Sequence, residues 1–347
     1  MNEVRVYVSN WRCIAEADFS LSRINIFMGP NSVGKSSLAY AVYFAIKSLR
    51  RDPKILLSQL YGCDFKEIAR REKDKPIFPI KIGINGLTLS IEEEEDRINV
   101  KRSGGISIWR STYLLPSRRI GYLQALTLLP KLLREIRAKP EAEVTLRVIG
   151  SWIGGLIEVF KGIPLFPPLP AFLSDYNEAL EGRSLEYSGR FGDAGRYIMS
   201  ISPLLLLIDL IYEDPYTKLR LPTELAPDGI LDMILFDTLT KNIKDSLLVI
   251  EEPEIHKNPV KIVEFTEHIV DRVLKNNLTI IMTTHTEIIP LTIAQLIVKG
   301  EAEINARDVK IYYFTRDPWT RLSEVKIYED GTLEGLPDVE KITEHLF

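Results

Sequence analysis

The chain is 347 residues long, 45% of them hydrophobic, with a formal net charge of −4. It has enough apolar material for one large domain or two smaller ones, and no bulk positive charge that would favour nucleic-acid binding. Cys13 and Cys63 are too few for a disulfide framework and lack metal-ligand spacing. Since the N-terminus shows no signal-peptide pattern and no apolar run reaches the roughly 20 residues that span a bilayer, we expect a soluble cytoplasmic protein without membrane contact.

The first 28 residues predict a strand pair followed by a buried strand. Residues 4–8 alternate as in a strand, Asn10-Trp11-Arg12 turns the chain, and residues 14–19 form the expected hairpin partner. Residues 24–28 are a short apolar run that predicts a buried strand.

The next residues match the phosphate-binding loop pattern of two glycines followed by Lys-Ser. They are Gly29, Pro30, Asn31, Ser32, Val33, Gly34, Lys35 and Ser36, and Ser37 follows in the first turn of a predicted helix. Glycines let backbone N–H groups approach a polyphosphate, and the helix start adds its positive end. The pattern predicts that Lys35 reaches the β- and γ-phosphates of ATP and that the Ser36 hydroxyl ligates Mg²⁺. A chance match is the alternative, and the flanking strand and helix disfavour it.

The hydrophobic pattern changes twice in the middle of the chain. Short alternating segments at residues 80–84, 87–91, 98–101 and 106–109, separated by Gly-containing turns, predict an antiparallel sheet. The acidic run 92–96 is interpreted as a solvated turn and not as a metal cluster. From Gly121 to about Tyr212, leucines at helical spacing without a sustained heptad predict a compact helical lobe and not a long coiled coil.

Short apolar runs typical of the strands of a parallel sheet follow, and polar residues come directly after two of them. The apolar run 246–250 ends at Glu251 and Glu252, residues 259–274 predict a helix, and the run 278–282 leads to His285. Residues 309–314 and 325–328 predict closing strands, and residues 341–347 a last helical turn. Polar residues at the carboxyl ends of parallel strands are typical of α/β nucleotide sites.

A phosphate loop needs a carboxylate for the metal and a group that positions the attacking water. Adjacent residues that leave a strand point to opposite sides, so we assign Glu251 to the Mg²⁺ shell through water and Glu252 to activation of the water. His285 is expected to hydrogen-bond the γ-phosphate. The alternatives are a helix start for Glu-Glu-Pro and a polar strand cap for His285.

This order of motifs resembles the ABC-class ATPase heads. Within them it is most similar to the branch that contains RecF, the SMC proteins and the ATPase half of the overcoming-lysogenization-defect nucleases, with the Glu-Glu-Pro-Glu-Ile-His-Lys-Asn-Pro stretch at 251–259 among the matching motifs. The resemblance implies an α/β ABC-type P-loop head, a mixed sheet with an antiparallel N-terminal subdomain, over residues 1–118 and 223–347. The helical insertion, 119–222, stands where SMC proteins carry their coiled coil.

By the same resemblance, two heads sandwich ATP and Mg²⁺ in an ATP-dependent homodimer, each supplying a signature loop to the other's γ-phosphate. The chain departs from that pattern at residues 225–230, Leu-Ala-Pro-Asp-Gly-Ile, which lack the signature serine and place Asp228 near the expected phosphate. Gly229 and the following helix start remain candidates. Residues 114–119 stand in place of the glutamine loop, with Ser117 or Arg118 as substitutes. Residues 286–347 are too few for a nuclease domain.

Four functions are compatible with a phosphate loop of this kind, and the other features of the chain disfavour two of them. The first is an ATP-hydrolysing switch that controls DNA in repair, maintenance or defence, or a partner enzyme. The alternative is a protein-regulatory ATPase without DNA contact, which acts on a separate effector protein through the insertion. An energising subunit of a membrane transporter is disfavoured by the early antiparallel sheet and the large insertion. A small-molecule kinase would lack the His285 position and need an acceptor pocket.

Overall fold

A computed structural model of the chain describes residues 3–95, 97–105, 108–121, 167–180, 185–190, 196–202, 207–214, 216–222, 225–300 and 303–336. These residues fall into two compact units. The first comprises residues 1–58, 63–117 and 243–347, and the second comprises residues 59–62 and 118–242.

A seven-stranded mixed sheet forms the centre of the first unit. Its strand order is β18-β17-β16-β3-β15-β14-β9. The bounds are β3 Ile24–Met28, β9 Thr112–Leu115, β14 Leu247–Glu251, β15 Thr279–Thr284, β16 Val309–Arg316, β17 Thr320–Ile327 and β18 Leu333–Glu334. The pairs from β16 through β3, β15 and β14 to β9 are parallel, and β17 is antiparallel to β16. Every residue of β3, β14 and β15 is buried, as expected for strands covered on both faces.

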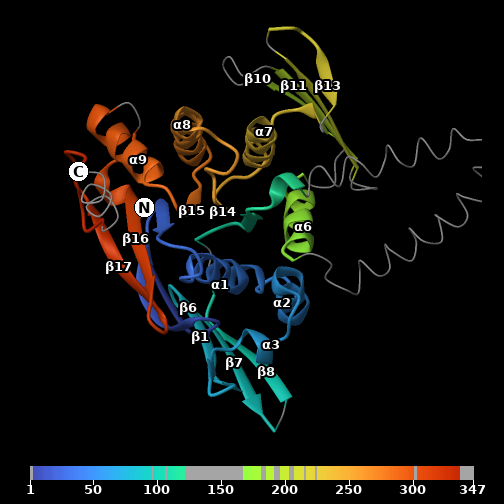
Figure 1. Cartoon of the computed structure of the whole chain (residues 1–347). Coiled ribbons are helices and arrows are strands. Elements are labelled where there is room, and N and C mark those ends of the chain that lie inside the picture. The colour runs from blue at the N-terminus through green and yellow to red at the C-terminus, as the bar shows by residue number, and fades with distance from the viewer. Residues whose placement is uncertain are drawn as a thin grey trace, which may run out of the picture. The chain divides into compact units, whose positions relative to one another are not determined.

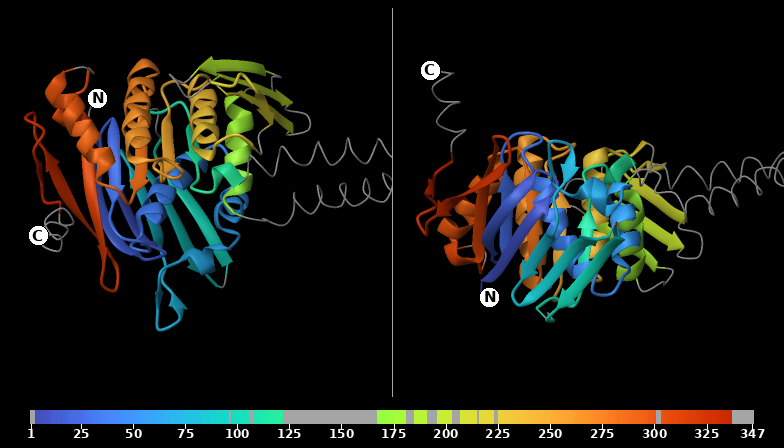
Figure 2. Two further views of the ribbon diagram at one scale, coloured as in Figure 1. Left: turned by 45° about the horizontal axis from the view of Figure 1, so that its top comes forward. Right: turned by 90° about the horizontal axis from the view of Figure 1, so that it is seen from below.

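Helix α1 (Lys35–Lys47) lies between this sheet and a second, five-stranded antiparallel sheet (Figures 1 and 2). The second sheet has the order β2-β1-β6-β7-β8, with β1 Val4–Trp11, β2 Ile14–Leu21, β6 Ile80–Ile84, β7 Leu87–Glu94 and β8 Arg97–Ser103. Because α1 is apolar almost all round, it is stable only where both of its sides are covered. Trp11 packs on Phe44 with ring centroids 5.2 Å apart. The two sheets therefore enclose α1 from both sides.

The remaining elements of the first unit are short or cover the outer face of the main sheet. Helices α8 (Pro259–Lys275) and α9 (Ile288–Lys299) lie on the face of that sheet opposite to α1 (Figure 1). Between α1 and β6 the chain forms α2 (Pro53–Tyr61), α3 (Phe65–Ile68), β4 (Arg71–Glu72) and β5 (Lys75–Pro76). A 3₁₀ turn, Ala306–Asp308, precedes β16.

The second unit contains strands as well as helices. Helix α6 spans Leu169–Ala179 and α7 spans Asp228–Thr240. A four-stranded antiparallel sheet has the order β10-β11-β12-β13, with β10 Leu185–Arg190, β11 Arg196–Ser202, β12 Leu207–Glu213 and β13 Arg220–Pro222. The buried side chains of Arg119 and Asp232 form an ion pair, each 1% exposed, which ties the start of this unit to α7.

Several sequence predictions are confirmed, and others differ from the structure. The N-terminal hairpin, the antiparallel sheet over residues 80–101, the helix after the glycine loop and the strands near residues 247, 279, 309 and 325 are observed. The predicted helical lobe is wrong for residues 185–190, 196–202, 207–213 and 220–222, which form strands; their sequences are rich in Ile, Leu and Tyr, and β-branched and aromatic residues favour strands. The second compact unit ends at Asn242, and the domain boundary predicted at residue 222 stays a prediction.

The strand predicted over residues 106–109 is not found at residues 108 and 109, and residues 106 and 107 lie outside the described part of the chain. The strand near this point is β9, from Thr112 to Leu115, and it pairs in parallel with β14 and not with the antiparallel sheet. Two further predictions lie outside the described residues. They are the part of the predicted helical lobe over residues 122–166, with the predicted absence of a coiled coil there, and the helical turn at 341–347.

Candidate functional site

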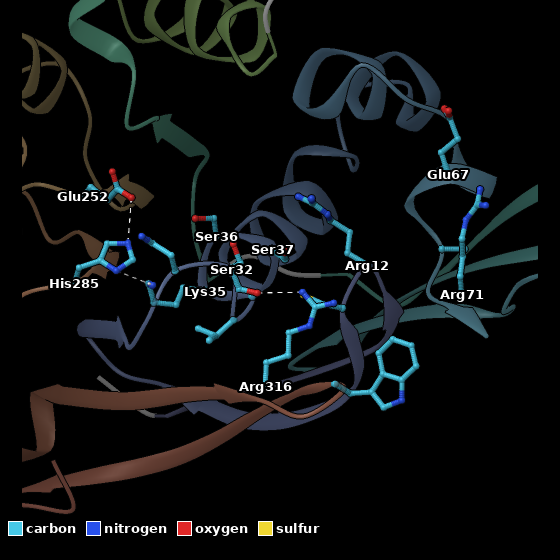
Figure 3. A pocket seen from close by; sticks show the side chains of 16 residues that line it. Arg12, Ser32, Lys35, Ser36, Ser37, Glu67, Arg71, Glu252, His285 and Arg316 are labelled. Carbon is cyan, nitrogen blue, oxygen red and sulfur yellow. Dashed lines mark hydrogen bonds and ion pairs between the residues drawn. The ribbon is translucent and has the colours of Figure 1, made fainter. Parts of the chain in front are cut away.

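A cavity of about 710 Å³ opens along the phosphate loop of the first unit (Figure 3). The loop residues Asn31 to Ser37 line it, together with Glu252 and His285 from the ends of β14 and β15. At its other end the lining consists of Arg12, Cys13, Glu67, Ala69, Arg71, Arg316 and Trp319. The carboxyl ends of three parallel strands thus meet at one cavity, as the parallel register of β3, β14 and β15 requires.

Both glycines of the loop occupy positions that exclude a side chain. Gly29 has φ 132° and Gly34 has φ 107°, values that L-residues rarely adopt. A Cβ on Gly29 would lie 2.5 Å from the carbonyl oxygen of Phe314, and a Cβ on Gly34 would lie 2.4 Å from Thr320 Oγ1. The sequence predicts glycine for close approach to phosphate, and the structure adds that the loop packs tightly against β16 and β17.

Lys35 lies buried at the start of α1, with its ammonium turned back onto the loop. Nζ donates hydrogen bonds of 2.7 Å to the carbonyl oxygens of Gly29 and Pro30. Burial lowers the pKa of Lys35 to about 8, and the carboxylates of Glu252, Glu254 and Glu251 oppose that shift. Nζ therefore lies among acceptor oxygens, and an anionic ligand bound there would favour the charged form of the ammonium.

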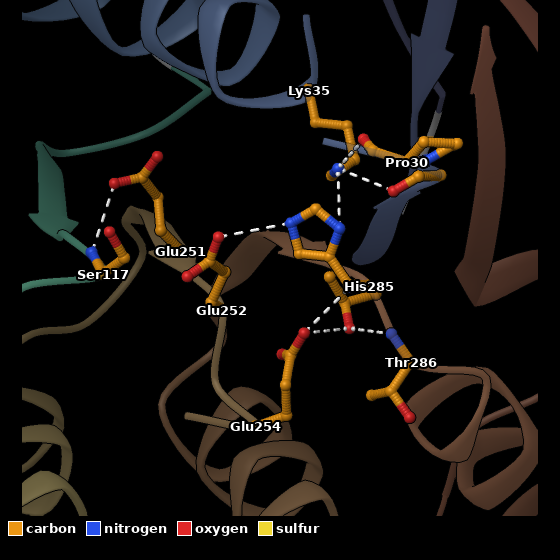
Figure 4. Close-up of polar contacts among 10 residues, drawn as sticks. Pro30, Lys35, Ser117, Glu251, Glu252, Glu254, His285 and Thr286 are labelled. Atoms are coloured by element: carbon orange, nitrogen blue, oxygen red, sulfur yellow. Dashed lines mark hydrogen bonds and ion pairs between the residues drawn. The ribbon is translucent and has the colours of Figure 1, made fainter. Parts of the chain in front are cut away.

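His285 bridges Lys35 and Glu252 (Figure 4). Its Nδ1 lies 3.3 Å from Lys35 Nζ, and its Nε2 lies 3.3 Å from Glu252 Oε1. Because an ammonium group can only donate, Nδ1 accepts, and the network assigns the proton to Nε2, from which it points to the carboxylate. Three residues that the sequence predicts for one site are thus joined by two polar contacts, Lys35 to His285 and His285 to Glu252.

The adjacent carboxylates Glu251 and Glu252 point into different surroundings, as their positions at the end of a strand predict. Glu251 is 8% exposed, and its Oε2 accepts hydrogen bonds from Tyr40 Oη at 2.6 Å and from the backbone N–H of Ser117 at 3.2 Å. Glu252 has φ 46°, a left-handed conformation in which the chain leaves β14 and carries the side chain into the cavity. In Figure 4, Glu251 faces Ser117 and Glu252 faces His285.

Glu254 is a site residue to which the sequence analysis assigns no role. Its Oε1 accepts hydrogen bonds from the Thr284 hydroxyl and from the backbone N–H of His285, both at 2.8 Å (Figure 4). Thr284 Oγ1 in turn accepts from the backbone N–H of Thr286 at 3.1 Å. These contacts fix the turn from which the imidazole projects. The acidic residues at the end of β14 were a visible signal, but their pairing with the end of β15 depends on the sheet.

The residues around Ser36 fit a magnesium ion that is shared with phosphate oxygens. Ser36 lines the cavity, and Tyr40, one helical turn later on the same face of α1, donates to Glu251. The carboxylate is thereby held beside the face that carries the serine hydroxyl. Mg²⁺ is bound by one or two carboxylates and keeps several waters, so it needs no larger cluster of acids. Among the described residues no group of three or more acidic, His or Cys side chains could hold a metal by itself.

The stretches predicted to replace the family's signature and glutamine loops are placed as follows. Residues 225–230 lie in the second unit, where Asp228 and Gly229 form the first turn of α7. Ser117 is in the first unit and touches Glu251 through its backbone, whereas Arg118 belongs to the second unit. The roles predicted for Gly229 and Arg118 remain predictions.

The outer end of the cavity contains residues that the motif search missed. Arg71 lies in β4, Arg316 at the end of β16, and Trp319 in the turn before β17. No local pattern links Arg71 to Arg316 and Trp319, which follow it by more than 240 positions and meet it only in the folded chain. Arg12, from the Asn-Trp-Arg turn, completes this end (Figure 3).

Solved structures with the same architecture are SMC head domains. One is the SMC head bound to the C-winged helix domain of ScpA, with a TM-score of 0.55 and 11% identity over 94% of this chain and 98% of that one. Another is the SMC head with an extended coiled coil bound to the C-terminal domain of ScpA from Pyrococcus furiosus, with a TM-score of 0.50 and 11% identity over 99% of this chain and 98% of that one. The chain has the fold of an ABC-type ATPase head. This confirms the predicted fold class.

Sequence comparison adds no closer relation. No protein-family model and no curated protein matches the chain. At 11% identity the structural likeness establishes the fold alone. Among the described residues no helix is long and apolar enough to cross a membrane.

Proposed function

We propose that this protein binds ATP with Mg²⁺ in the cavity and hydrolyses it to ADP and phosphate. The chain of polar contacts from Lys35 through His285 to Glu252 is the observation that carries the proposal. It joins the end of a phosphate loop to a carboxylate and an imidazole at the carboxyl ends of adjacent parallel strands. A positive charge for the phosphates, a base for water and a donor for the γ-phosphate are the groups that this hydrolysis needs.

In this proposal each residue has a separate task. Lys35 exchanges its bonds to the carbonyls of Gly29 and Pro30 for bonds to the β- and γ-phosphates. Glu252 orients the attacking water and accepts its proton as the oxygen bonds to the γ-phosphorus and the bond to the β-phosphate oxygen breaks. His285 Nε2–H turns from Glu252 to the γ-phosphate oxygen. Ser36, and Glu251 through water, would hold Mg²⁺, which would supply positive charge against the phosphate oxygens.

We further propose that ATP binding brings two heads together and so works as a switch. The fold supports this step, because the chain shares it with SMC heads. Both of those solved heads are bound to a part of ScpA, which supports an effector protein as a partner of this chain as well. The switch then controls either DNA or such an effector.

The test of ATP binding is Lys35→Ala. The substitution removes the charge aimed at the phosphates, so isothermal titration with ATP and Mg²⁺ should show no measurable binding. Lys54→Ala, which removes an exposed lysine at the start of α2, is the matched control and should bind ATP as the wild type does. Unchanged ATP affinity in Lys35→Ala would sink the proposed function.

A regulatory ATPase without DNA contact is the second candidate, and the net charge of −4 favours it. Titration of fluorescent duplex DNA at several salt concentrations, with and without ATP, separates the two. Binding through phosphate contacts weakens steeply as salt rises. Affinity that is absent at low salt would assign the switch to a protein effector.

A further inference from the structure

The turn between β16 and β17 is held directly against the phosphate loop. Arg316 Nη1 donates to the carbonyl oxygen of Ser32 at 3.1 Å, and Thr320 Oγ1 donates to the carbonyl oxygen of Val33 at 2.7 Å. The backbone N–H of Thr320 also bonds the carbonyl oxygen of Cys13 at 3.0 Å. Residues 317–319 are therefore anchored on both sides at the wall of the cavity.

Trp319 is the aromatic residue of this anchored turn, and it lines the cavity. Its side chain is half-buried, and the guanidinium carbon of Arg70 lies 4.8 Å from its ring centroid. Arg70 is itself tied to Asn10, with Nε donating to Asn10 Oδ1 at 3.0 Å. The indole is thus supported from the N-terminal hairpin while it stays in contact with the cavity.

The two ends of the cavity offer different chemistry to one ligand. The end at Lys35 and His285 is suited to the terminal phosphates, so the rest of a nucleotide must extend toward the other end. There the lining combines an indole with the guanidinium groups of Arg12 and Arg71. Flat π-systems stack favourably on indole and guanidinium planes, and such stacking requires no base-specific hydrogen bond.

We propose that Trp319 is the platform on which the base of a purine nucleoside triphosphate stacks, with Arg12 and Arg71 beside it. The proposal rests on the proposed nucleotide site and deepens it, because it states how the chain selects a nucleotide over a bare polyphosphate. A purine covers more of the indole than a pyrimidine does, so ATP and GTP bind more tightly than UTP. Since the same turn touches Ser32 and Val33, the base and the phosphate loop share one support.

The experiment compares nucleotides with inorganic tripolyphosphate, which has the phosphates and no base. Calorimetric titrations in Mg²⁺ are made with ATP, GTP, UTP and tripolyphosphate on the wild type, Trp319→Ala and Trp319→Phe. Loss of base stacking should weaken ATP and GTP by about tenfold or more in Trp319→Ala. Tripolyphosphate should bind Trp319→Ala as it binds the wild type, and Trp319→Phe, which keeps a flat ring, should recover most of the affinity for ATP.

Three results would overturn the platform and leave the ATPase proposal standing. They are unchanged ATP affinity in Trp319→Ala, equal losses for ATP and tripolyphosphate, and a wild type that binds both ligands equally well. Equal losses would show that the indole only supports the phosphate loop. A wild type that binds neither ATP nor tripolyphosphate would instead refute the nucleotide site itself, and the platform with it.

Discussion

The two ends of the cavity differ in how their charged side chains are held. At the phosphate end, Lys35 is buried and bonded to two carbonyl oxygens and to His285, and Glu251 is buried and bonded to Tyr40. At the other end the guanidinium-bearing residues Arg12, Arg71 and Arg316 are exposed. The first end is organised before a ligand arrives, and the second offers exposed charge around a single half-buried indole.

This difference suggests that the phosphate end determines the rate of hydrolysis and the other end determines the affinity for the nucleotide. Groups that are fixed in advance at the reacting phosphate can interact more strongly with the transition state than with bound ATP, and this difference raises the rate. Exposed groups around a base hold the ground state and the transition state equally well, so they change affinity alone. We expect substitutions at the phosphate end to reduce kcat and those at the Trp319 end to raise the dissociation constant.

The largest effect on the rate is expected for Glu252→Gln. The amide keeps the shape of the side chain but cannot accept the proton of the water, so hydrolysis should fall by about 10² to 10⁴-fold while ATP still binds. A coupled assay for released phosphate measures the first effect, and calorimetry measures the second.

Trapped ATP should also hold two chains together, since a composite site is complete only across the interface. Light scattering after size exclusion should show a dimer for Glu252→Gln with ATP, and little dimer for the wild type or with ADP. Hydrolysis at the wild-type rate would void the catalytic assignment. A variant that retains ATP but stays monomeric would leave the chemistry intact and refute the two-head switch.

A smaller loss of rate is expected for His285→Ala. A hydrogen bond to a charged oxygen contributes about 1.5–3 kcal/mol, which corresponds to roughly ten- to a hundredfold in kcat if the bond forms mainly during the reaction. The affinity for ATP should change little. His268→Ala, in α8 and outside the cavity lining, is the matched control. Turnover within a factor of about two of the wild type would make His285 a strand cap.

The affinity for ATP should depend on pH through Lys35. Burial lowers its pKa from 10.5 to about 8, and the phosphates of ATP favour the protonated ammonium. Below pH 8 the charge is already present, and above pH 8 binding must take up a proton. Affinity should therefore fall by up to about tenfold per pH unit as the pH rises above 8. Lys35→Arg, which stays charged, should show a flat profile. A flat wild-type profile from pH 7 to 9.5 contradicts this prediction.

The smallest effect is expected for Glu254, which positions His285 without reaching the cavity. Glu254→Ala frees the backbone N–H of His285 and should lower kcat several-fold with the KM for ATP unchanged. Glu254→Gln keeps an acceptor oxygen and should restore the rate. Thr284→Val removes only the hydroxyl half of the contact and should lie between the two. Equal losses in the Ala and Gln variants would assign Glu254 to stability and not to positioning.

The sequence by itself determined the phosphate end of the site. Gly29 to Ser37 is a contiguous pattern, and Glu251, Glu252 and His285 each follow an apolar strand, so local order was enough to place them together at one edge of a parallel sheet. Strand alternation predicts that Glu251 and Glu252 separate, whereas in the structure they separate because the chain leaves β14 with φ 46° at Glu252. The glycine loop and the apolar strands are patterns of a few consecutive residues, so the sequence shows them directly.

Tertiary structure alone decided the other end and the second unit. Trp319, Arg71 and Arg12 meet because the turn after β16 bonds Ser32 and Cys13, a contact between segments about 300 positions apart that no local period encodes. Likewise, residues 196–202 and 207–213 have apolar side chains compatible with either a helix or a strand. Pairing with neighbouring strands selected the sheet, because backbone hydrogen bonds between strands form only when a partner is present.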